Sequence, residues 1–339
     1  MALATLTTRH PDVSVQALMA EFVPPPRFSA VRFATYRPDP AEPTQSAAVA
    51  GLEAFAQRIG QPAGKRSLFR RSAPPEGRAG IYLDGGFGVG KTHLLASLWH
   101  AVPGRKRFGT FVEYTNLVGA LGFRSAVDAL KDNDLVCIDE FELDDPGDTV
   151  LMSTLLGELV SAGVRLAATS NTLPDKLGEG RFAAEDFLRE IQGLAAHFDV
   201  FRVEGPDFRH RGAPQAPEPM KRQDVEYLAA RVPGATFDAF GSVEAHLATV
   251  HPSRYGAMID DIPLMCWTDV RPVQDQAQAL RLVVLVDRMY DRDIALVASG
   301  LPVDQVFTPE MLAGGYRKKY FRAISRLVAL AREGNAMVE

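Results

Sequence analysis

The segment GGFGVGKT at residues 85–92 places the strongest constraint on the fold of this 339-residue chain. It matches G-x-x-x-x-G-K-[ST] at every specified position, between an apolar run at residues 79–85 and an apolar helical pattern at residues 91–102. A loop whose backbone N–H groups converge on phosphate needs positive φ angles, which glycine adopts at low cost. The segment therefore predicts a strand, a phosphate-binding loop and a helix whose N-terminus faces an anion.

The side chains of this loop indicate how a nucleotide would be held. Lys91 is expected to contact the β- and γ-phosphates, and Thr92 to supply a hydroxyl to Mg²⁺. His93 directly follows and is a further candidate for nucleotide contact, with packing of its helix as the alternative. The candidate nucleotide-binding residues of the segment are Gly85, Gly86, Phe87, Gly88, Val89, Gly90, Lys91, Thr92 and His93.

An acidic pair, Asp139 and Glu140, ends the apolar run LVCIDE, 48 residues beyond Lys91. A parallel strand beside the P-loop strand would deliver its carboxyl end to the phosphates. Asp139 would then hold Mg²⁺ through water, and Glu140 would orient or deprotonate the attacking water. The alternative, two acids that merely begin a loop, is disfavoured by the P-loop upstream.

A polar strand tip follows in VRLAATSN, where Thr169 and Ser170 precede Asn171. Asn171 is expected to hydrogen-bond the γ-phosphate or the attacking water; capping of the following turn is the alternative. The order of P-loop, acidic pair and polar tip is that of the AAA+ type of P-loop ATPase.

Strand-like and helical segments alternate from residue 79 to residue 205. The predicted strands are 79–85, 107–115, 134–141, 164–171 and 199–205, and the predicted helices are 91–102, 116–130, 149–163 and 182–198. Strands separated by helices favour a parallel sheet covered on both faces. The expected fold is therefore α/β: a P-loop NTPase (AAA+-like) sheet with helices on both faces, plus a smaller C-terminal αβ region.

Three regions are expected along the chain. Residues 1–45 form a proline-punctuated N-terminal arm, residues 46–210 the P-loop ATPase core, and residues 211–339 the C-terminal αβ region with a terminal helix. A helix is predicted over 44–59, with Thr44 as its N-cap. The C-terminal region should contain strands at 263–269 and 293–300 and helices at 275–290 and 320–333.

Two segments about 130 residues apart resemble each other. The run from LVCIDE to LAATSN and the run from LMCWTD to ALVASG have a similar order of apolar and polar residues. The alternative is that any two buried β–α–β units look alike. In the second run Thr268 and Asp269 replace the acidic pair, so that run cannot carry the same chemistry.

The net charge, the two cysteines and the apolar segments limit the classes of partner and of site that this chain is expected to have. The net charge of −5 argues against a nucleic acid or an anionic membrane as the main partner. Cys137 and Cys266 lie in apolar runs outside any CxxC or Cys/His pattern, which is typical of buried reduced thiols. No apolar window is long enough for a transmembrane helix, and the N-terminus lacks the pattern of a secretory signal.

Arginines are candidates for a role supplied by a neighbouring subunit. AAA+ ATPases usually hydrolyse ATP at subunit interfaces, where the planar guanidinium of an arginine stabilises spread negative charge. Arg181 and Arg189 follow Asn171 in the right part of the chain. Arg322, with Arg326 one turn later, is a candidate to reach the nucleotide from the C-terminal region. A surface ion pair is the alternative for each of them.

With these residues in view, the chain resembles the ZapE cell-division ATPase family, which includes related mitochondrial inner-membrane ATPases. The resemblance extends from about Pro24 to Leu330. It is carried by segments beyond the general ATPase motifs: PPPRF and TYRPDP, IDEFELDDPGDTVLMSTLL, LAATSNTLPDKL, HPSRYGAMIDDI, LVVLVDRMYDRDIALVASG and FRAISRL.

The resemblance implies a cytoplasmic, Mg²⁺-dependent ATPase that forms a nucleotide-dependent homo-oligomer. In bacteria the family is associated with the constricting division ring and with FtsZ, so FtsZ is the expected protein partner and recruitment to the division site is expected. Two departures from the family stand out. Ala184 and Asp186 occupy positions where arginines are common, so Arg181 or Arg189 would have to substitute, and the last apolar strand ends in VASGLP.

Two other functions remain open on the sequence. GVGKTHLL also resembles the start of the P-loop helix in helicase loaders, which act on nucleic-acid complexes. Direct nucleic-acid binding is not expected, because the C-terminal third lacks interleaved basic and aromatic residues. A scaffold that binds ATP without hydrolysing it is disfavoured by the intact Glu140.

Overall fold

The computed structural model describes residues 3–60, 77–86, 88–141, 146–173, 192–193, 195–205 and 216–337. The chain divides into two compact units. Residues Met19–Arg211 form the P-loop unit, and Met1–Leu18 together with Gly212–Glu339 form the C-terminal unit. The expected N-terminal arm, residues 1–45, is thereby shared between the two units.

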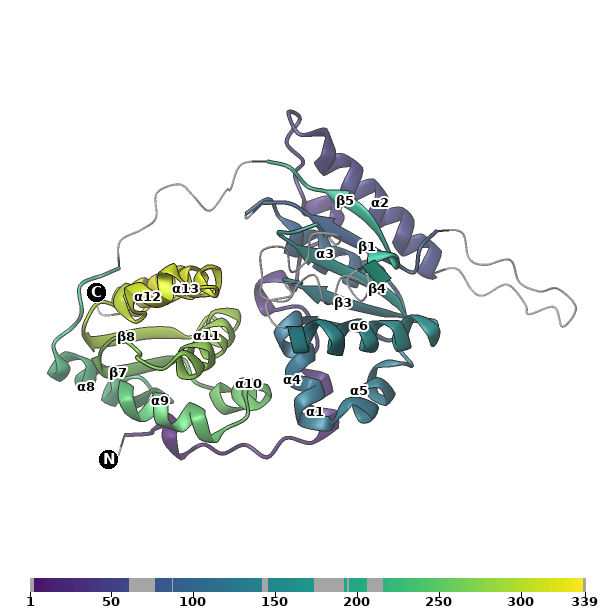
Figure 1. Ribbon diagram of the computed structural model, residues 1–339. Coiled ribbons are helices and arrows are strands. Elements are labelled where there is room, and N and C mark those ends of the chain that lie inside the picture. The colour runs from purple at the N-terminus through teal and green to yellow at the C-terminus, as the bar shows by residue number, and fades with distance from the viewer. Residues whose placement is uncertain are drawn as a thin grey trace, which may run out of the picture. The chain divides into compact units, whose positions relative to one another are not determined.

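The P-loop unit is built on a five-stranded parallel sheet with the order β2-β3-β4-β1-β5 (Figure 1). The P-loop strand β1 therefore lies between β4 and β5, and β3 lies on the far side of β4. The bounds are β1 Gly80–Asp84, β2 Lys106–Thr110, β3 Leu135–Asp139, β4 Arg165–Ser170 and β5 Phe198–Arg202. Every residue of β1 and β3 is buried, as expected for central strands of a sheet covered on both faces.

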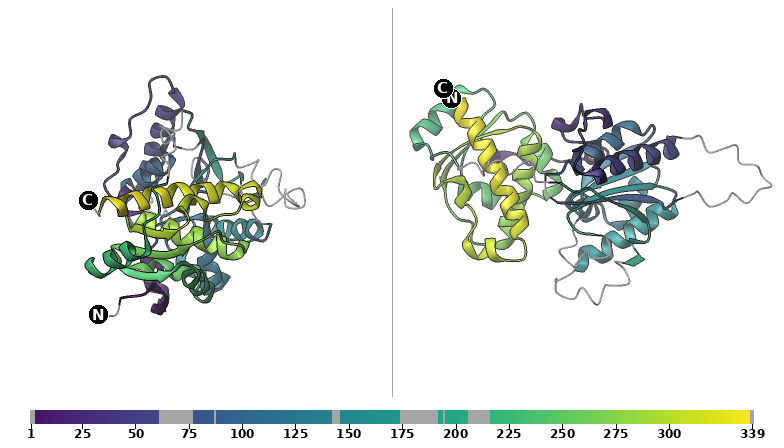
Figure 2. Two further views of the ribbon diagram at one scale, coloured as in Figure 1. Left: turned by 90° about the vertical axis from the view of Figure 1, so that its left-hand side faces the viewer. Right: turned by 90° about the horizontal axis from the view of Figure 1, so that it is seen from above.

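Helices cover both faces of this sheet (Figure 2). One face packs against α2 Pro43–Gly60 and α3 Lys91–Ala101, where Leu52, Phe55 and Leu95 meet the strand residues Leu83 and Cys137. The remaining helices described in this unit are α4 Phe111–Leu121, α5 Phe123–Leu130 and α6 Pro146–Ser161, with α1 Val15–Ala20 crossing the boundary between the two units. The sheet and its helices confirm the predicted α/β P-loop architecture.

The predicted strand at 107–115 is wrong in its second half. Strand β2 ends at Thr110, and the next residue begins α4. Thr110 caps this helix, because its hydroxyl accepts from the backbone N–H of Glu113 while the Glu113 carboxylate accepts from the N–H of Thr110. This reciprocal capping box satisfies two backbone donors that would otherwise be unpaired at the helix start. The β-branched and aromatic residues of TFVEYT concealed the T-x-x-E signal.

The first long helix begins one residue before its predicted N-cap. Helix α2 starts at Pro43, a favourable first helical residue because its fixed φ suits the helix and its missing N–H costs no bond. The hydroxyl of Thr44 instead accepts from the backbone N–H of Glu204, 3.1 Å away, just beyond β5. Thr44 therefore ties α2 to the end of the sheet.

The C-terminal unit has its own three-stranded parallel sheet, in the order β6-β7-β8. Its core includes Trp267, and Met265 and Trp267 face α9, α11 and α13, while Cys266 faces α8. The strands are β6 Thr236–Ala239, β7 Leu264–Val270 and β8 Ala295–Gly300, and the helices are α8 Arg222–Arg231, α9 Phe240–Thr249, α10 Tyr255–Ile259, α11 Gln276–Asp291, α12 Pro309–Ala313 and α13 Arg317–Ala336. This unit contains the smaller C-terminal αβ region that the sequence predicts, together with the first residues of the chain.

The N-terminal segment binds the C-terminal unit through backbone and side-chain contacts. The carbonyl of Ala4 accepts from the N–H of Phe237 in β6, and the Asp238 carboxylate accepts from the N–H groups of Leu6 and Thr7. Farther along, the carbonyl of Phe22 accepts from the N–H of Phe108 in β2, within the P-loop unit. The first residues of the chain therefore complete the sheet of one unit before the chain enters the other.

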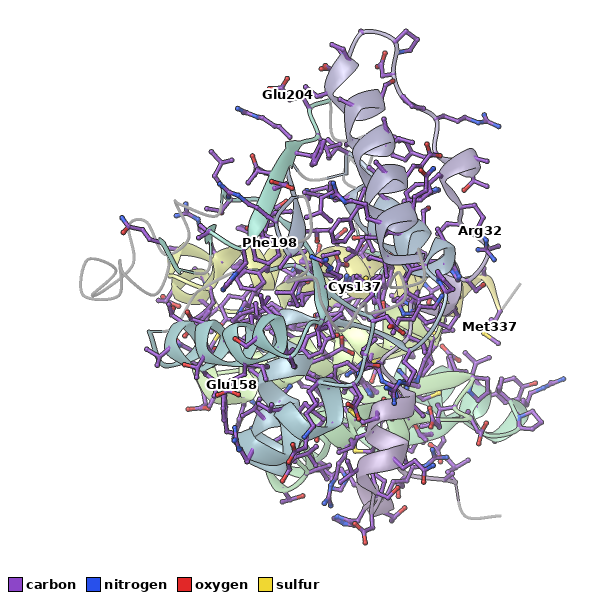
Figure 3. All side chains as sticks on the ribbon, turned by 90° about the vertical axis from the view of Figure 1, so that its right-hand side faces the viewer. Arg32, Cys137, Glu158, Phe198, Glu204 and Met337 are labelled. Carbon is purple, nitrogen blue, oxygen red and sulfur yellow. The ribbon has the colours of Figure 1, made fainter. Side chains whose placement is uncertain are left out.

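The remaining sequence expectations concern the thiols and the membrane. Both cysteines are buried and unpaired, and burial raises the pKa of the Cys137 thiol, which lies inside the P-loop unit (Figure 3). Among the described residues, no helix combines the length and the apolar character that crossing a bilayer requires.

Candidate active site

The glycine-rich loop joins β1 to α3 in the conformation that phosphate binding needs. Gly88 and Gly90 have φ angles of 71° and 90°, which lie in the left-handed region that L side chains rarely adopt. Gly85 is constrained differently, because a Cβ there would lie 2.1 Å from the carbonyl oxygen of Val203. The helix begins at Lys91, so its first backbone N–H groups and its partial positive charge are directed toward the loop.

The side chain of Lys91, the first residue of α3, reaches back to the loop. Its ammonium donates to the carbonyl oxygens of Gly85 and Gly86, at 2.7 and 2.5 Å, and to Oδ1 of Asn171, at 2.9 Å. The first two contacts follow from the fold of the loop, whereas the third joins the P-loop to the tip of β4. The structure thus brings two of the predicted catalytic residues, Lys91 and Asn171, into direct contact.

Thr92 and Asp139 form the predicted oxygen pair for a metal ion. The Thr92 hydroxyl donates to the Asp139 carboxylate, with distances of 3.2 and 3.0 Å to its two oxygens. The pKa of Asp139 is raised to about 6, chiefly by burial and next by the neighbouring Glu140, while hydrogen bonds from Thr169 and Thr92 and the charge of Lys91 oppose the rise. A hydroxyl and a buried carboxylate without nitrogen or sulfur donors are the ligand types that Mg²⁺ prefers.

Glu140 follows Asp139 in an unusual backbone conformation. Its φ is 54°, in the left-handed region, and its backbone N–H donates to the hydroxyl of Thr169 in β4, at 3.0 Å. The next residue, Phe141, donates its N–H to the carbonyl of Thr169 at 2.7 Å. The turn at Glu140 therefore ends β3 abruptly, and the neighbouring strand β4 holds it in place.

A pocket of about 620 Å³ adjoins the loop within the P-loop unit. It lies at the carboxyl ends of β1, β4 and β5, where ligands bind in open parallel sheets. The buried Tyr82 holds the lining residue Thr172, because the Tyr82 hydroxyl donates to the carbonyl of Thr172 at 2.7 Å. The pocket is lined by Asp84, Gly85, Gly86, Asn171, Thr172, Leu173, Arg202, Val203, Glu204 and Gly205.

Residues of the N-terminal arm contact the far side of the loop. The Tyr36 hydroxyl donates to the carbonyl of Val89 at 2.9 Å, and its ring lies so close that a Cβ on Gly90 would be 2.6 Å from Cε2. His93 turns toward the same arm, with Nε2 2.9 Å from the Thr35 hydroxyl and its ring 5.6 Å from that of Tyr36. Burial lowers the pKa of His93. The described contacts of the His93 side chain are thus hydrogen bonding and a ring contact with the arm.

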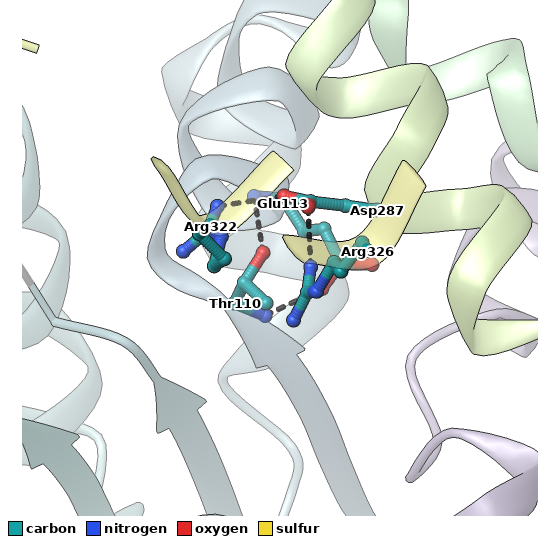
Figure 4. A network of polar contacts seen from close by, with 5 residues as sticks. All are labelled: Thr110, Glu113, Asp287, Arg322 and Arg326. Atoms are coloured by element: carbon teal, nitrogen blue, oxygen red, sulfur yellow. Dashed lines mark hydrogen bonds and ion pairs between the residues drawn. The ribbon is translucent and has the colours of Figure 1, made fainter. Parts of the chain in front are cut away.

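The structure describes two of the four candidate arginines, Arg322 and Arg326. Arg322 and Arg326 in α13 both donate to the carboxylate of Asp287 in α11, Arg322 at 2.6 Å (Figure 4). All three side chains are about four-fifths buried, so Arg322 forms a buried ion pair with another residue of the C-terminal unit, and its proposed contact with the nucleotide stays a prediction. Arg181 and Arg189, like Phe87 of the loop, lie outside the described residues, and their proposed roles stay predictions.

Sequence reasoning missed several residues that the fold brings to the site. Tyr36 and Thr35 support the P-loop from the arm, and Arg202 and Glu204 reach the pocket from β5 and the residues that follow it. TYRPDP was noted only for the family resemblance and as part of a proline-punctuated arm, because no local pattern shows which loop an arm will contact. The strand signal for β5 was present, and its position beside β1 would have placed Arg202 at the pocket.

Comparisons with known proteins find a matching family model and similar proteins. The family model described as AFG1-like ATPase matches residues 12–229 and 217–336. The chain is 25% identical to the cell division protein ZapE of Escherichia coli (strain K12) over 325 residues, covering 81% of this chain and 83% of that protein. It is also 25% identical to Lactation elevated protein 1 homolog B of Danio rerio over 175 residues, 43% of this chain and 34% of that protein.

Among solved structures, the fold is similar to domain III of the replication initiation protein DnaA of Thermotoga maritima. The TM-score is 0.41 and the identity 21%, covering 54% of this chain and 69% of that chain. The two matched segments of the family model together cover nearly the whole chain and include every element of the site. This protein is an ATPase and belongs to the AFG1-like ATPase family.

Proposed function

We propose that the protein uses Mg²⁺-dependent ATP hydrolysis to remodel a protein partner in cell division, and that this partner is FtsZ. The observation that carries the catalytic part is the convergence of Lys91, Thr92, Asp139 and Asn171 at the carboxyl ends of β1, β3 and β4. These groups come from three segments of the chain and form two hydrogen-bonded pairs, Lys91 with Asn171 and Thr92 with Asp139. Glu140 continues directly from the end of β3.

In this proposal, the loop and Lys91 bind the triphosphate. The N–H groups of the loop and the N-terminus of α3 attract the phosphate oxygens, and the Lys91 ammonium exchanges carbonyl partners for the β- and γ-phosphates. Thr92 and Asp139 would hold Mg²⁺, the first directly and the second through water. The ion, when bound, neutralises charge that develops on the phosphates during transfer.

Glu140 and Asn171 are the proposed residues that position and activate the attacking water. The Glu140 carboxylate orients a water in line with the γ-phosphorus and accepts its proton as the new P–O bond forms and the bond to ADP breaks. Asn171, already in contact with Lys91, places its amide where the γ-phosphate or the attacking water would lie. Arg181 or Arg189 from a neighbouring subunit would stabilise the charge on the transferring group, which requires a nucleotide-dependent homo-oligomer.

The choice of partner is supported by the relative and by the resemblance of the motifs. The cell division protein ZapE matches 81% of this chain, including both units. In this proposal the protein acts in the cytoplasm and is recruited to the division site, where polymers of FtsZ are its substrate.

The test uses the Glu140→Gln variant, which keeps the size and polarity of the side chain but cannot accept a proton. We expect ATP binding to persist while steady-state phosphate release falls by a factor of about 100 or more. The trapped variant should co-sediment with FtsZ polymers in the presence of ATP more than in the presence of ADP. Lys91→Ala, which should lose ATP, is the control for nucleotide dependence.

Two results would contradict the proposal. Normal phosphate release by Glu140→Gln would remove the catalytic assignment of Glu140. Equal co-sedimentation with ATP, with ADP and with Lys91→Ala would remove the coupling of ATP to FtsZ. Salt-dependent binding of single-stranded DNA by the trapped variant, without FtsZ binding, would favour the helicase-loader function instead.

A further inference from the structure

Thr169 contacts both acidic residues of the site. Its hydroxyl donates a hydrogen bond to Oδ1 of Asp139 and accepts one from the backbone N–H of Glu140, at 3.0 Å. Its carbonyl oxygen accepts from the N–H of Phe141, at 2.7 Å. Only 2% of Thr169 is exposed, so no water competes for these bonds. One residue of β4 thus holds three consecutive residues at the end of β3.

These contacts stabilise a conformation that the chain would otherwise avoid. Glu140 has a φ of 54°, and a residue with a Cβ is held in the left-handed region only when its surroundings over-determine it. The hydroxyl of Thr169 is donor and acceptor at once, which lets it satisfy the Asp139 carboxylate and the Glu140 N–H together. A valine of the same shape would leave both groups without this partner in a dry environment.

The C-terminal unit contains the same backbone arrangement without the catalytic residues. Asp269, near the end of β7, has a φ of 59°, and its N–H donates to the hydroxyl of Ser299 in the neighbouring strand β8, at 3.4 Å. Thr268 precedes Asp269 at the position that Asp139 occupies before Glu140. The Ser299 hydroxyl therefore has no carboxylate there to which it could donate. Asp269 pairs with Arg222 at 2.8 Å and remains about two-thirds exposed. The two sheets therefore share the turn, and the P-loop unit adds the bond to a carboxylate.

We propose that Thr169 is a positioning residue for ATP hydrolysis, which sets the Glu140 turn and the orientation of the Asp139 carboxylate through one hydroxyl. The inference rests on the proposed roles of Asp139 and Glu140. It assigns Thr169 no contact with the nucleotide. Removal of the Thr169 hydroxyl should therefore change the rate of ATP hydrolysis and the Mg²⁺ requirement rather than the affinity for ATP.

The test compares three substitutions at this position. Thr169→Val keeps the shape and removes the hydroxyl, and we expect kcat to fall about 10- to 100-fold and the Mg²⁺ concentration for half-maximal activity to rise. The affinity for ATP, measured in the absence of Mg²⁺, should change less than about threefold, because the loop and Lys91 remain. Thr169→Ser, which restores the hydroxyl, should recover most of the rate. Thr169→Cys, with its weak S–H donor, should resemble valine.

Matched controls separate positioning from packing. Thr236 in β6 is also fully buried on a parallel strand, and its hydroxyl has no hydrogen-bond partner among the residues that the structure describes. Thr236→Val should therefore leave kcat and the Mg²⁺ dependence unchanged. Ser299→Ala removes the equivalent hydroxyl from the C-terminal unit and should also leave both unchanged.

The outcomes distinguish this inference from the proposed catalytic roles. If Glu140→Gln abolishes turnover while folded Thr169→Val retains the wild-type kcat and Mg²⁺ dependence, the positioning role is wrong and the catalytic role of Glu140 stands. If Glu140→Gln turns over normally, the catalytic role fails first, and the positioning role fails with it. If Thr169→Val does not fold, the cysteine and serine variants decide, and equal rates for the two would overturn the inference.

Discussion

The ammonium of Lys91 donates to the side-chain oxygen of Asn171 across 2.9 Å, although 80 residues separate them in the sequence. The contact is possible because β4 pairs directly with β1 in parallel register, with Leu83 opposite Thr169 and Asp84 opposite Ser170. The tip of β4 therefore ends beside the start of the P-loop. The contact joins the residue proposed to bind the β- and γ-phosphates to the residue proposed to contact the γ-phosphate.

This contact predicts that Asn171 distinguishes ATP from ADP. Asn171→Ala should weaken ATP binding by a factor of about five, the equivalent of about 1 kcal/mol for one hydrogen bond. The affinity for ADP should stay within about twofold of wild type, because ADP lacks the γ-phosphate and Lys91 keeps its loop contacts. Titration with both nucleotides in the same buffer measures the ratio. An equal loss for ATP and ADP would place Asn171 on the β-phosphate or assign it a purely structural role.

Gly90 should tolerate no side chain, for two independent reasons. Its φ is 90°, and an added Cβ would lie 2.6 Å from Cε2 of Tyr36. Gly90→Ala should cost about 1–2 kcal/mol from the left-handed conformation alone and should weaken ATP binding, because the loop must shift. Gly157 in α6 offers a matched control, since nothing lies within 4 Å of its Cβ position. Gly157→Ala should stabilise the protein by about 0.5–1 kcal/mol.

Thermal unfolding and nucleotide titration of the two glycine variants test this prediction. If Gly90→Ala bound ATP normally and unfolded at the wild-type temperature, the strain at the start of α3 would be disproved. The Tyr36 contact has its own signature, because a smaller side chain at position 36 would relieve the clash but not the unfavourable φ. The double variant Gly90→Ala with Tyr36→Ala should therefore recover only part of the lost ATP affinity.

Asp287 should make the stability of the C-terminal unit depend on pH. Burial raises the pKa of Asp287, but the charges and hydrogen bonds of Arg322 and Arg326 outweigh it and leave the pKa below its usual value. A depressed pKa contributes stability above the unfolded value, which is about 3.9, and that stability is lost as the pH falls through the folded value. Asp287→Asn should cost about 1–3 kcal/mol at pH 7, because two guanidiniums lose their shared carboxylate.

Urea unfolding at several pH values checks the direction of this pH dependence. The difference between wild type and Asp287→Asn should be largest at neutral pH and should shrink as the pH falls below about 4. Asp128 is the matched control, because its ion pair with Lys131 is exposed on both sides. Asp128→Asn should have little effect on the unfolding of the protein. A difference for Asp287→Asn that grew in acid would show that the carboxyl group is protonated in the folded protein.

Local motifs accounted for much of the site before any tertiary structure was considered. The glycines of residues 85–92 and the helix behind them were recognisable because a phosphate loop is a backbone conformation of consecutive residues. LVCIDE and VRLAATSN were recognisable as buried strands that end in polar residues, and their placement beside β1 followed from the rule for parallel sheets. The strand predicted at 107–115 failed locally, because the capping box at Thr110 and Glu113 prevailed over β-branched and aromatic propensity.

The sequence by itself therefore determined most of the elements, the loop and the chemical types of the candidate catalytic residues, since each depends on neighbours within a few positions. Only the tertiary structure decided which residues meet. The pairing of β4 with β1 and β3 brought Thr169 under both acids and Asn171 to Lys91, and the path of the arm brought Tyr36 to Gly90. Such contacts follow from strand register and packing between segments far apart in the chain, and no local pattern of residues encodes them.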